Sequence, residues 1–245
     1  MATAGAAPQP QPQPHPPAAS AGGQADLLRV LMALTTLSGL VDAVCYLGLG
    51  RVFTANMTGN VVLLGFAAAG APGFSVTASL TSLLVFLAGA VAGGRITQHV
   101  TRRSRMLAVV ILSESVLVAA AAVVAFLAST VSAGWGRYTT IAILAFAMGI
   151  RNAGIRRLAI PDMTTTVLTQ TLTGLAADSF LAGGANIRAG RRSAAVVAMA
   201  AGAAGGAALF LHRGAALPLA ISAAAAAVIM IAFWFSRAGQ FLDSP

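Results

Sequence analysis

Charged residues are scarce in this chain of 245 residues, where they make up 9% of the total, and lysine is absent altogether. A soluble globular domain carries roughly 25% charged residues. Hydrophobic residues account for 58% of the chain, and its mean hydropathy is +0.84. This shortage of charge excludes an ordinary soluble domain and indicates an all-α, polytopic transmembrane helical bundle in contact with the lipid bilayer.

Cysteine pairs and clustered histidines are also missing. Cys45 is the single cysteine, which excludes an intramolecular disulfide. His15, His99 and His212 lie far apart, so no metal-ligand spacing is present. The sequence contains no nucleophile elbow, P-loop or HExxH motif. We therefore expect a protein that is not an enzyme and has neither a cofactor nor a metal.

The positive charge does not indicate a nucleic-acid partner. The net charge is +9, and all 15 basic residues are arginines. They lie at the ends of apolar segments, where cytoplasmic loops collect them, and no basic run contains interleaved aromatic residues.

Residues 1–25 are rich in Ala, Pro and Gln, and the run PQPQPQPHPP favours extended conformations that build no core. We expect a disordered tail, followed by a single transmembrane domain over residues 26–240. The tail lacks the basic region of a signal peptide, so the first helix should remain uncleaved. The predicted spans are residues 27–49, 76–96, 106–130, 138–150, 194–211 and 217–235.

Two further segments lie between these spans, and each is broken by polar residues. Residues 57–69 are apolar but shorter than the roughly 20 residues that a crossing requires. They form either a re-entrant half-helix or a thin span continued through residues 74–76. The second segment is rich in threonine and extends from Pro161 to Gly184.

Asp42 is the most unusual residue of the first span. It shares a helical face with Thr35, Ser38, Cys45 and Tyr46, at spacings of three, four and seven residues. A carboxylate is costly in lipid, so this polar stripe should face protein or water.

The two halves of the domain, residues 27–130 and 138–236, share three features in the same order. The motif Gly-x-x-Asp-Ala at Gly39 matches Gly-x-x-Asn-Ala at Gly149, and the run from Asn56 to Val61 matches the run from Asp162 to Val167. Each half then has a GxxxG pair, Gly89 and Gly93 in the first and Gly202 and Gly206 in the second, which predicts close helix packing. An internal repeat is therefore predicted.

The arginines predict the orientation. With six spans and both termini in the cytoplasm, twelve arginines lie inside, and only Arg51, Arg137 and Arg213 lie outside. A seven-span arrangement gives the same count by exchanging Arg29 for Arg51, so charge does not decide between them. Three spans in each half would invert the second half, as in many transporters, and we favour six spans by that analogy.

The polar motifs of both halves resemble those of the YoaK-like (DUF1275) family of bacterial integral membrane proteins. The matching residues are Gly39, Asp42, Ala43, Phe53, Asn56, Met57, Thr58, Gly59 and Asn60, with Gly149, Arg151, Asn152, Ala153 and the threonines after Met163. The resemblance covers nearly all of residues 27–235. It implies a multi-span protein of the bacterial inner membrane and assigns no biochemical function.

The candidate residues for a solute or ion site come from both halves. They are Asp42, Asn56, Thr58, Gly59, Asn60, Arg151, Asn152, Asp162, Thr164, Thr165 and Asp178. Asp42 could carry a proton or bind a solute, or it could only hydrogen-bond the backbone of the helix break or an arginine of the other half. Thr58 could cap a helix whose exposed amides suit an anion. Asp178 could pair with an arginine, and Glu114 is expected to pair with the arginines near its membrane entry.

We expect a transporter or channel for a small polar solute, with Asp42 as a candidate proton carrier. The alternative is an accessory or scaffold membrane protein in which the polar residues serve only packing. Neither the solute nor the oligomeric state follows from the sequence.

Overall fold

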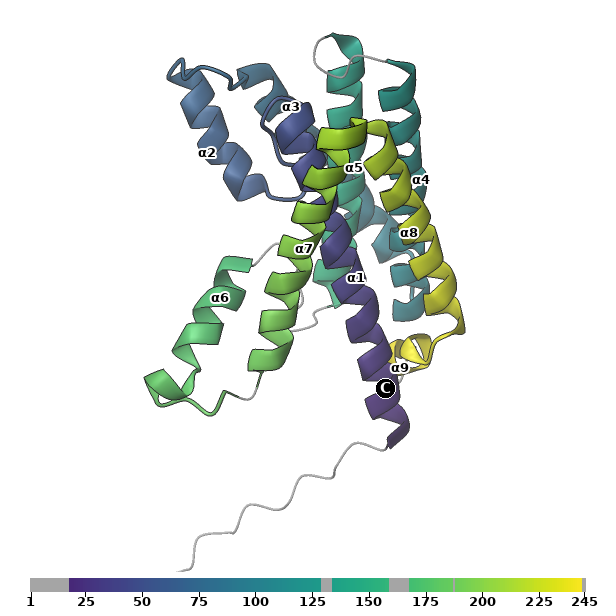
Figure 1. The fold of residues 1–245 in the computed structure, drawn as a ribbon. Coiled ribbons are helices and arrows are strands. Elements are labelled where there is room, and N and C mark those ends of the chain that lie inside the picture. The colour runs from purple at the N-terminus through teal and green to yellow at the C-terminus, as the bar shows by residue number, and fades with distance from the viewer. Residues whose placement is uncertain (1–17, 129–133, 159–167, 187, 244–245) are drawn as a thin grey trace, which may run out of the picture.

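The computed structural model describes residues 18–128, 134–158, 168–186 and 188–243, and these residues form an all-α bundle (Figure 1). The helices are α1 (Ala18–Gly48), α2 (Met57–Ala68), α3 (Val76–Gln98), α4 (Arg103–Leu127), α5 (Trp135–Leu158), α6 (Leu168–Ala177), α7 (Ala189–Arg213), α8 (Ala216–Phe235) and α9 (Ala238–Asp243), with a 3₁₀ turn at Phe180–Ala182. Within the described residues six helices are long and apolar enough to cross a membrane: α1, α3, α4, α5, α7 and α8.

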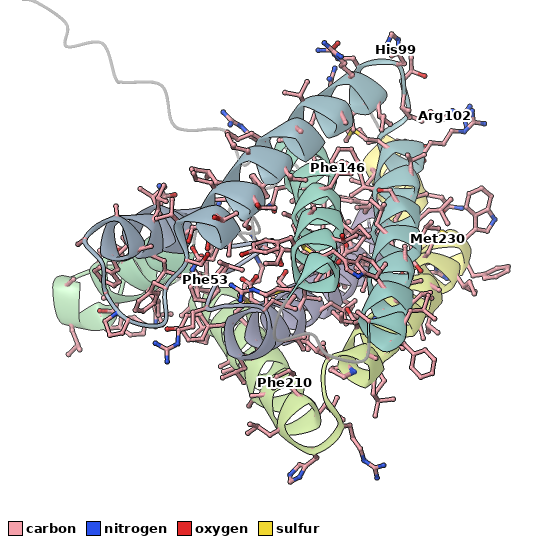
Figure 2. The ribbon with its side chains drawn as sticks, turned by 90° about the horizontal axis from the view of Figure 1, so that it is seen from above. Phe53, His99, Arg102, Phe146, Phe210 and Met230 are labelled. Carbon is pink, nitrogen blue, oxygen red and sulfur yellow. The ribbon has the colours of Figure 1, made fainter. Side chains whose placement is uncertain are left out.

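Helices α1, α4, α5 and α8 pack together, and α3 and α7 pack on α5 and α1 respectively. The short helices α2 and α6 project from the same side of the bundle at different heights, α2 beside α3 and α6 beside α7 (Figure 1). Viewed from above, α3 runs obliquely from the side of Phe53 and α2 to His99, with Phe146 of α5 beneath it (Figure 2).

Contacts between named residues give the directions of the helices. Arg137 Nε, in the first turn of α5, donates a hydrogen bond of 3.1 Å to Leu49 O just after α1. Arg151, later in α5, donates to Ser38, which precedes Leu49 in α1, so α1 and α5 are antiparallel. Gly89 and Gly93 of α3 lie against Phe146 and Ile150 of α5, so α3 and α5 are parallel. Gly202 and Gly206 of α7 lie against Thr36 and Leu40 of α1, so these helices are parallel as well.

Glycine is required where these pairs cross. A Cβ at Gly39 would overlap the backbone of Met199 and Ala203, and a Cβ at Gly149 would overlap the backbone of Phe86 and Ala90. The helices therefore touch backbone to backbone, which small residues allow.

The chain after α1 turns back into the bundle. Gly50 and Arg51 have positive φ angles of 96° and 56°, which break the helix, and the following residues descend beside α1 until Thr54 and Ala55 reach the level of Asp42. Seven residues of helix separate Asp42 from Leu49, a rise of about 10 Å. Helix α2 then leads back, because the Arg51 guanidinium lies 5.3 Å from the ring centroid of Phe74, just before α3.

Two apolar clusters fill the bundle. One surrounds Leu49, Leu144 and Leu219, at the end of the bundle where α1 finishes, which we call the loop end. The other surrounds Leu31, Leu107 and Ile155 at the opposite end, where α1 begins and α9 lies, which we call the terminal end. A core of this kind follows from the apolar composition of the helices.

Helix α9 is fastened to the start of α4. Asp243 accepts hydrogen bonds from Ser104 N at 3.1 Å and from Ser104 Oγ at 2.6 Å. Partial burial disfavours the charged carboxyl, but these bonds and the charges of Arg102 and Arg105 outweigh burial and lower the pKa of Asp243. The carboxylate thus caps α4, whose own N-cap residue, Arg102, makes no side-chain capping bond.

The structure differs from the expected elements in three places. Helix α1 begins at Ala18, inside the expected tail, because the Ala-rich sequence there favours helix. Helix α5 begins at Trp135, three residues before the predicted start of that span at residue 138. Helix α5 also continues past Ile150 to Leu158, because the charge of Arg151 is compensated inside the bundle.

Candidate functional site

Asp42 anchors the segment that turns back into the bundle. Its side chain is 4% exposed, and Oδ1 accepts hydrogen bonds from Thr54 N (2.8 Å), Ala55 N (2.9 Å) and Thr54 Oγ1 (3.3 Å). Its second oxygen, Oδ2, is buried and has no partner among the described residues. One oxygen therefore stabilises the helix break, whereas the described residues leave the other without a hydrogen bond.

The polar stripe of α1 is buried, as predicted. Thr35, Ser38 and Cys45 are at most 7% exposed, and Tyr46 stacks on Phe53 with ring centroids 5.1 Å apart. The stripe therefore faces protein.

Asn60 fixes the shape of the same segment from within α2. It is fully buried, its Oδ1 accepts from Phe53 N at 2.8 Å, and its Nδ2 donates to Phe53 O at 2.6 Å and Ser82 Oγ at 3.0 Å. Ser82 Oγ also donates to Phe53 O. Among the candidate site residues, Asn60 therefore has a structural position that ties the break to α3.

The first turn of α2 is capped by Asn56. Its Oδ1 accepts from Gly59 N at 3.4 Å, so the residue predicted as the cap, Thr58, is wrong by two positions. Thr58 lies inside the helix and its side chain is exposed. Gly59 packs against the ring of Phe53, which leaves no room for a Cβ.

A cavity of about 310 Å³ lies beside Asp42. Its described lining comes from α1, the segment before α2, α2, α6 and α7: Asp42, Ala55, Asn56, Thr58, Gly59, Val62, Leu168, Thr169, Leu172 and Met199. The first turn of α2 and the first described turn of α6 thus meet at one cavity with a buried carboxylate. Four of the candidate residues are brought together here, namely Asp42, Asn56, Thr58 and Gly59.

Arg151 occupies a different position. It is fully buried, and its Nη1 lies 2.7 Å from Glu114 Oε1 of α4. Its Nη2 donates to Ser38 Oγ of α1. Arg151 was counted among the cytoplasmic arginines and Glu114 was expected to pair near the membrane entry. The ion pair expected for Glu114 is present, but its partner is Arg151 in the bundle core, between α1, α4 and α5. The cytoplasmic assignment of Arg151 is therefore wrong.

The remaining candidates of the second half are dispersed. Asn152 follows Arg151 on α5 and is partly buried. Asp178 lies just after α6 and pairs with Arg192 at 2.6 Å, as one alternative predicted. Asp162, Thr164 and Thr165 lie outside the described residues.

Some cavity residues were not among the predicted site residues. Thr169, Leu172 and Met199 line the cavity from the second half of the chain. The threonine-rich segment was a signal for Thr169. Leu172 and Met199 are ordinary apolar residues in apolar helices, so only the fold identifies them.

The described residues define a polytopic helical membrane protein with six candidate spans, and the short helices α2 and α6 meet at this cavity. The chain belongs to the family described as "Protein of unknown function (DUF1275)", which it matches over residues 30–232. It is 33% identical over 151 residues to the UPF0700 transmembrane protein YoaK of Bacillus subtilis (strain 168). That match covers 61% of this chain and 65% of YoaK, slightly less than two thirds of the relative's length. No solved structure matches the chain.

Proposed function

We propose that the protein is a transporter for a small polar solute in the bacterial inner membrane, and that the cavity beside Asp42 is its solute site. The observation that carries this proposal is the cavity, lined jointly by a buried carboxylate, the start of α2 and the described start of α6. Short helices whose ends meet at a polar site within a bundle are typical of transporters, where backbone amides and side chains replace water around the solute.

The contacts between helices support an inverted repeat. Gly39 of α1 meets Met199 and Ala203 of α7, and Gly149 of α5 meets Phe86 and Ala90 of α3. The GxxxG glycines make equivalent contacts in the two halves. The glycines of α7 contact α1 at the residues three before and one after Gly39. The glycines of α3 contact α5 at the residues three before and one after Gly149. Because α1 and α5 are antiparallel, these equivalent contacts favour opposite orientations of the two halves.

The buried charges support proton coupling. Asp42 lies within electrostatic reach of Arg151, which already pairs with Glu114. Two carboxylates and one guanidinium leave one negative charge uncompensated when all are ionised. A low-dielectric core disfavours that state, so a proton or a positively charged group on the solute must balance Asp42.

The arginines support a cytoplasmic location for both termini. Without Arg151, eleven of the twelve arginines first assigned to the inside remain there, against Arg51, Arg137 and Arg213 outside.

Reconstituted protein tests the proposal. Proteoliposomes loaded with a pH-sensitive dye receive amino acids, amines, carboxylates and polyols in turn, and we expect at least one class to drive proton flux. Asp42→Asn should lower that flux at least tenfold, whereas Asp26→Asn should leave it unchanged, because Asp26 pairs with Arg29 outside the cavity lining. Unchanged flux in Asp42→Asn would remove Asp42 as the coupling group, and no flux with any class would contradict transport.

One observation favours the accessory or scaffold alternative: Asp42 Oδ1 already serves the backbone of Thr54 and Ala55. In that case no solute would drive flux, and Asp42 would matter only through these backbone bonds. An asparagine Oδ1 can accept the same two bonds, so a transporter should retain most of its stability in this variant and lose its flux.

A further inference from the structure

We propose that the cavity beside Asp42 binds a small zwitterion with an apolar body, the chemistry of an apolar α-amino acid. This inference rests on the proposed function only in that it places the ligand at the same cavity, and it does not require that the protein transports the ligand. Three features of the cavity lead to it: an unpartnered carboxylate oxygen, free amides at a helix start, and an apolar wall.

The carboxylate oxygen requires a donor from the ligand. Asp42 is 4% exposed and lines the cavity, and Oδ2 has no hydrogen-bond donor among the described residues. An unpaired carboxylate oxygen away from water is costly, and a charge-assisted bond from an ammonium group would satisfy it. No arginine or histidine is among the described residues that line the cavity. When the Asp42 carboxyl is ionised, an ammonium group on the ligand would therefore supply the compensating positive charge.

The amides at the start of α2 require an acceptor. Asn56 Oδ1 accepts from Gly59 N and Asn56 O accepts from Asn60 N, whereas the N–H groups of Met57 and Thr58 have no acceptor among the described residues. Free amides at the start of a helix of this length carry a partial positive charge that binds carboxylates. Asn56, Thr58 and Gly59 all line the cavity, so this helix end lies beside Asp42.

The rest of the lining is mostly apolar. Val62 of α2, Leu168 and Leu172 of α6 and Met199 of α7 provide hydrocarbon surface, with Thr169 as the polar residue of α6. A volume of about 310 Å³ equals that of about ten water molecules at roughly 30 Å³ each, which is enough for an amino acid with an aliphatic side chain. A bare metal ion would leave this apolar surface unused.

Binding to the full chain in detergent micelles tests the inference by calorimetric titration. The probes are L-leucine, 3-methylbutylamine and 4-methylpentanoate, which share one aliphatic skeleton. The amine lacks the carboxylate, and the acid lacks the ammonium group. We expect leucine to bind at least tenfold more tightly than either partial ligand.

Variants assign the two ends of the ligand. Asp42→Asn should lower leucine affinity at least tenfold, to the level of 4-methylpentanoate, and leave the affinity for 4-methylpentanoate unchanged. A purely structural role would weaken both ligands together. If Asp42→Asn does not fold, Leu172→Trp fills the cavity from a half-exposed position and should abolish leucine binding, whereas Thr173→Trp, exposed and outside the cavity lining, should not.

The outcomes separate the two proposals. Equal binding of leucine and either partial ligand, or no binding of leucine, would overturn the zwitterion inference. Proton flux driven by another solute class would then leave the transport proposal standing. Leucine binding without any flux in proteoliposomes would overturn transport and retain the binding site.

Discussion

At the scale of single residues, the ion pair between Arg151 and Glu114 bears most directly on stability. Both side chains are at most 1% exposed, and their contact distance is 2.7 Å. Removing one partner of such a pair leaves a buried charge uncompensated, which costs about 3–5 kcal/mol, whereas replacing both with apolar residues of similar volume is often neutral.

We therefore expect Glu114→Ala to lower the free energy of unfolding in detergent by about 3–5 kcal/mol. The double variant Glu114→Met with Arg151→Met should recover most of that loss, because no charge remains unpaired. Denaturant titration of the purified proteins measures both values. If the double variant is as unstable as Glu114→Ala, the pair has a role other than mutual neutralisation.

The sequence predicted Asp42 but not the partners of the other buried polar residues. A carboxylate within an apolar helix is visible from composition alone, and so is the need for a protein environment around it. Arg151 and Glu114 lie 37 residues apart on different helices, and no periodic pattern links them. Asn60 likewise differs from Asn56 only through its contacts with Phe53 and Ser82.

At the scale of elements, the lengths of the apolar runs predicted which segments form long helices, but they did not predict where those helices end. The span over residues 138–150 was expected to end at Ile150, yet helix α5 continues through Arg151 to Leu158. The pairing of Arg151 inside the bundle removes the electrostatic reason for a break. The short length of α2 was predicted from composition, whereas its return toward the loop end depends on Asp42 binding the backbone of Thr54 and Ala55.

The crossing of α1 and α7 gives a matched test on one helix. A Cβ at Gly202 would overlap the backbone of Thr36, whereas a Cβ at Gly205 meets nothing within 4 Å. Gly202→Ala should destabilise the protein by about 1–3 kcal/mol, because overpacking pushes the helices apart. Gly205→Ala should be neutral or stabilising by up to about 1 kcal/mol, because alanine favours helix.

Thermal unfolding of the two variants in the same detergent checks this contrast. Gly93→Ala and Gly94→Ala repeat the comparison at the crossing of α3 and α5, where Gly93 meets Ile150 and Gly94 has open space. Equal stability of the paired variants at both crossings would show that the helices separate without cost.

At the scale of the whole molecule, the two crossings belong to one arrangement. The pairs α1–α7 and α3–α5 each join a first helix of one half to a third segment of the other. Neither half can therefore pack its helices alone, and the halves must fold together. The sequence indicated two similar halves, but the exchange of partners between them depends on contacts that no single segment encodes.

The six-span arrangement predicts which residues share a side of the membrane. The contact of Arg51 with Phe74 places both ends of the segment from residue 51 to residue 74 at the loop end of the bundle.

Single cysteines are introduced at Arg51, Pro72 and Arg213 for the loop end and at Arg103 and Arg156 for the terminal end, in a Cys45→Ala background. With a membrane-impermeant maleimide, the first three should react in intact spheroplasts and the last two only in inverted vesicles. Reaction of Arg51→Cys and Pro72→Cys from opposite sides would overturn the arrangement, because α2 would then cross the membrane and the halves would no longer be inverted.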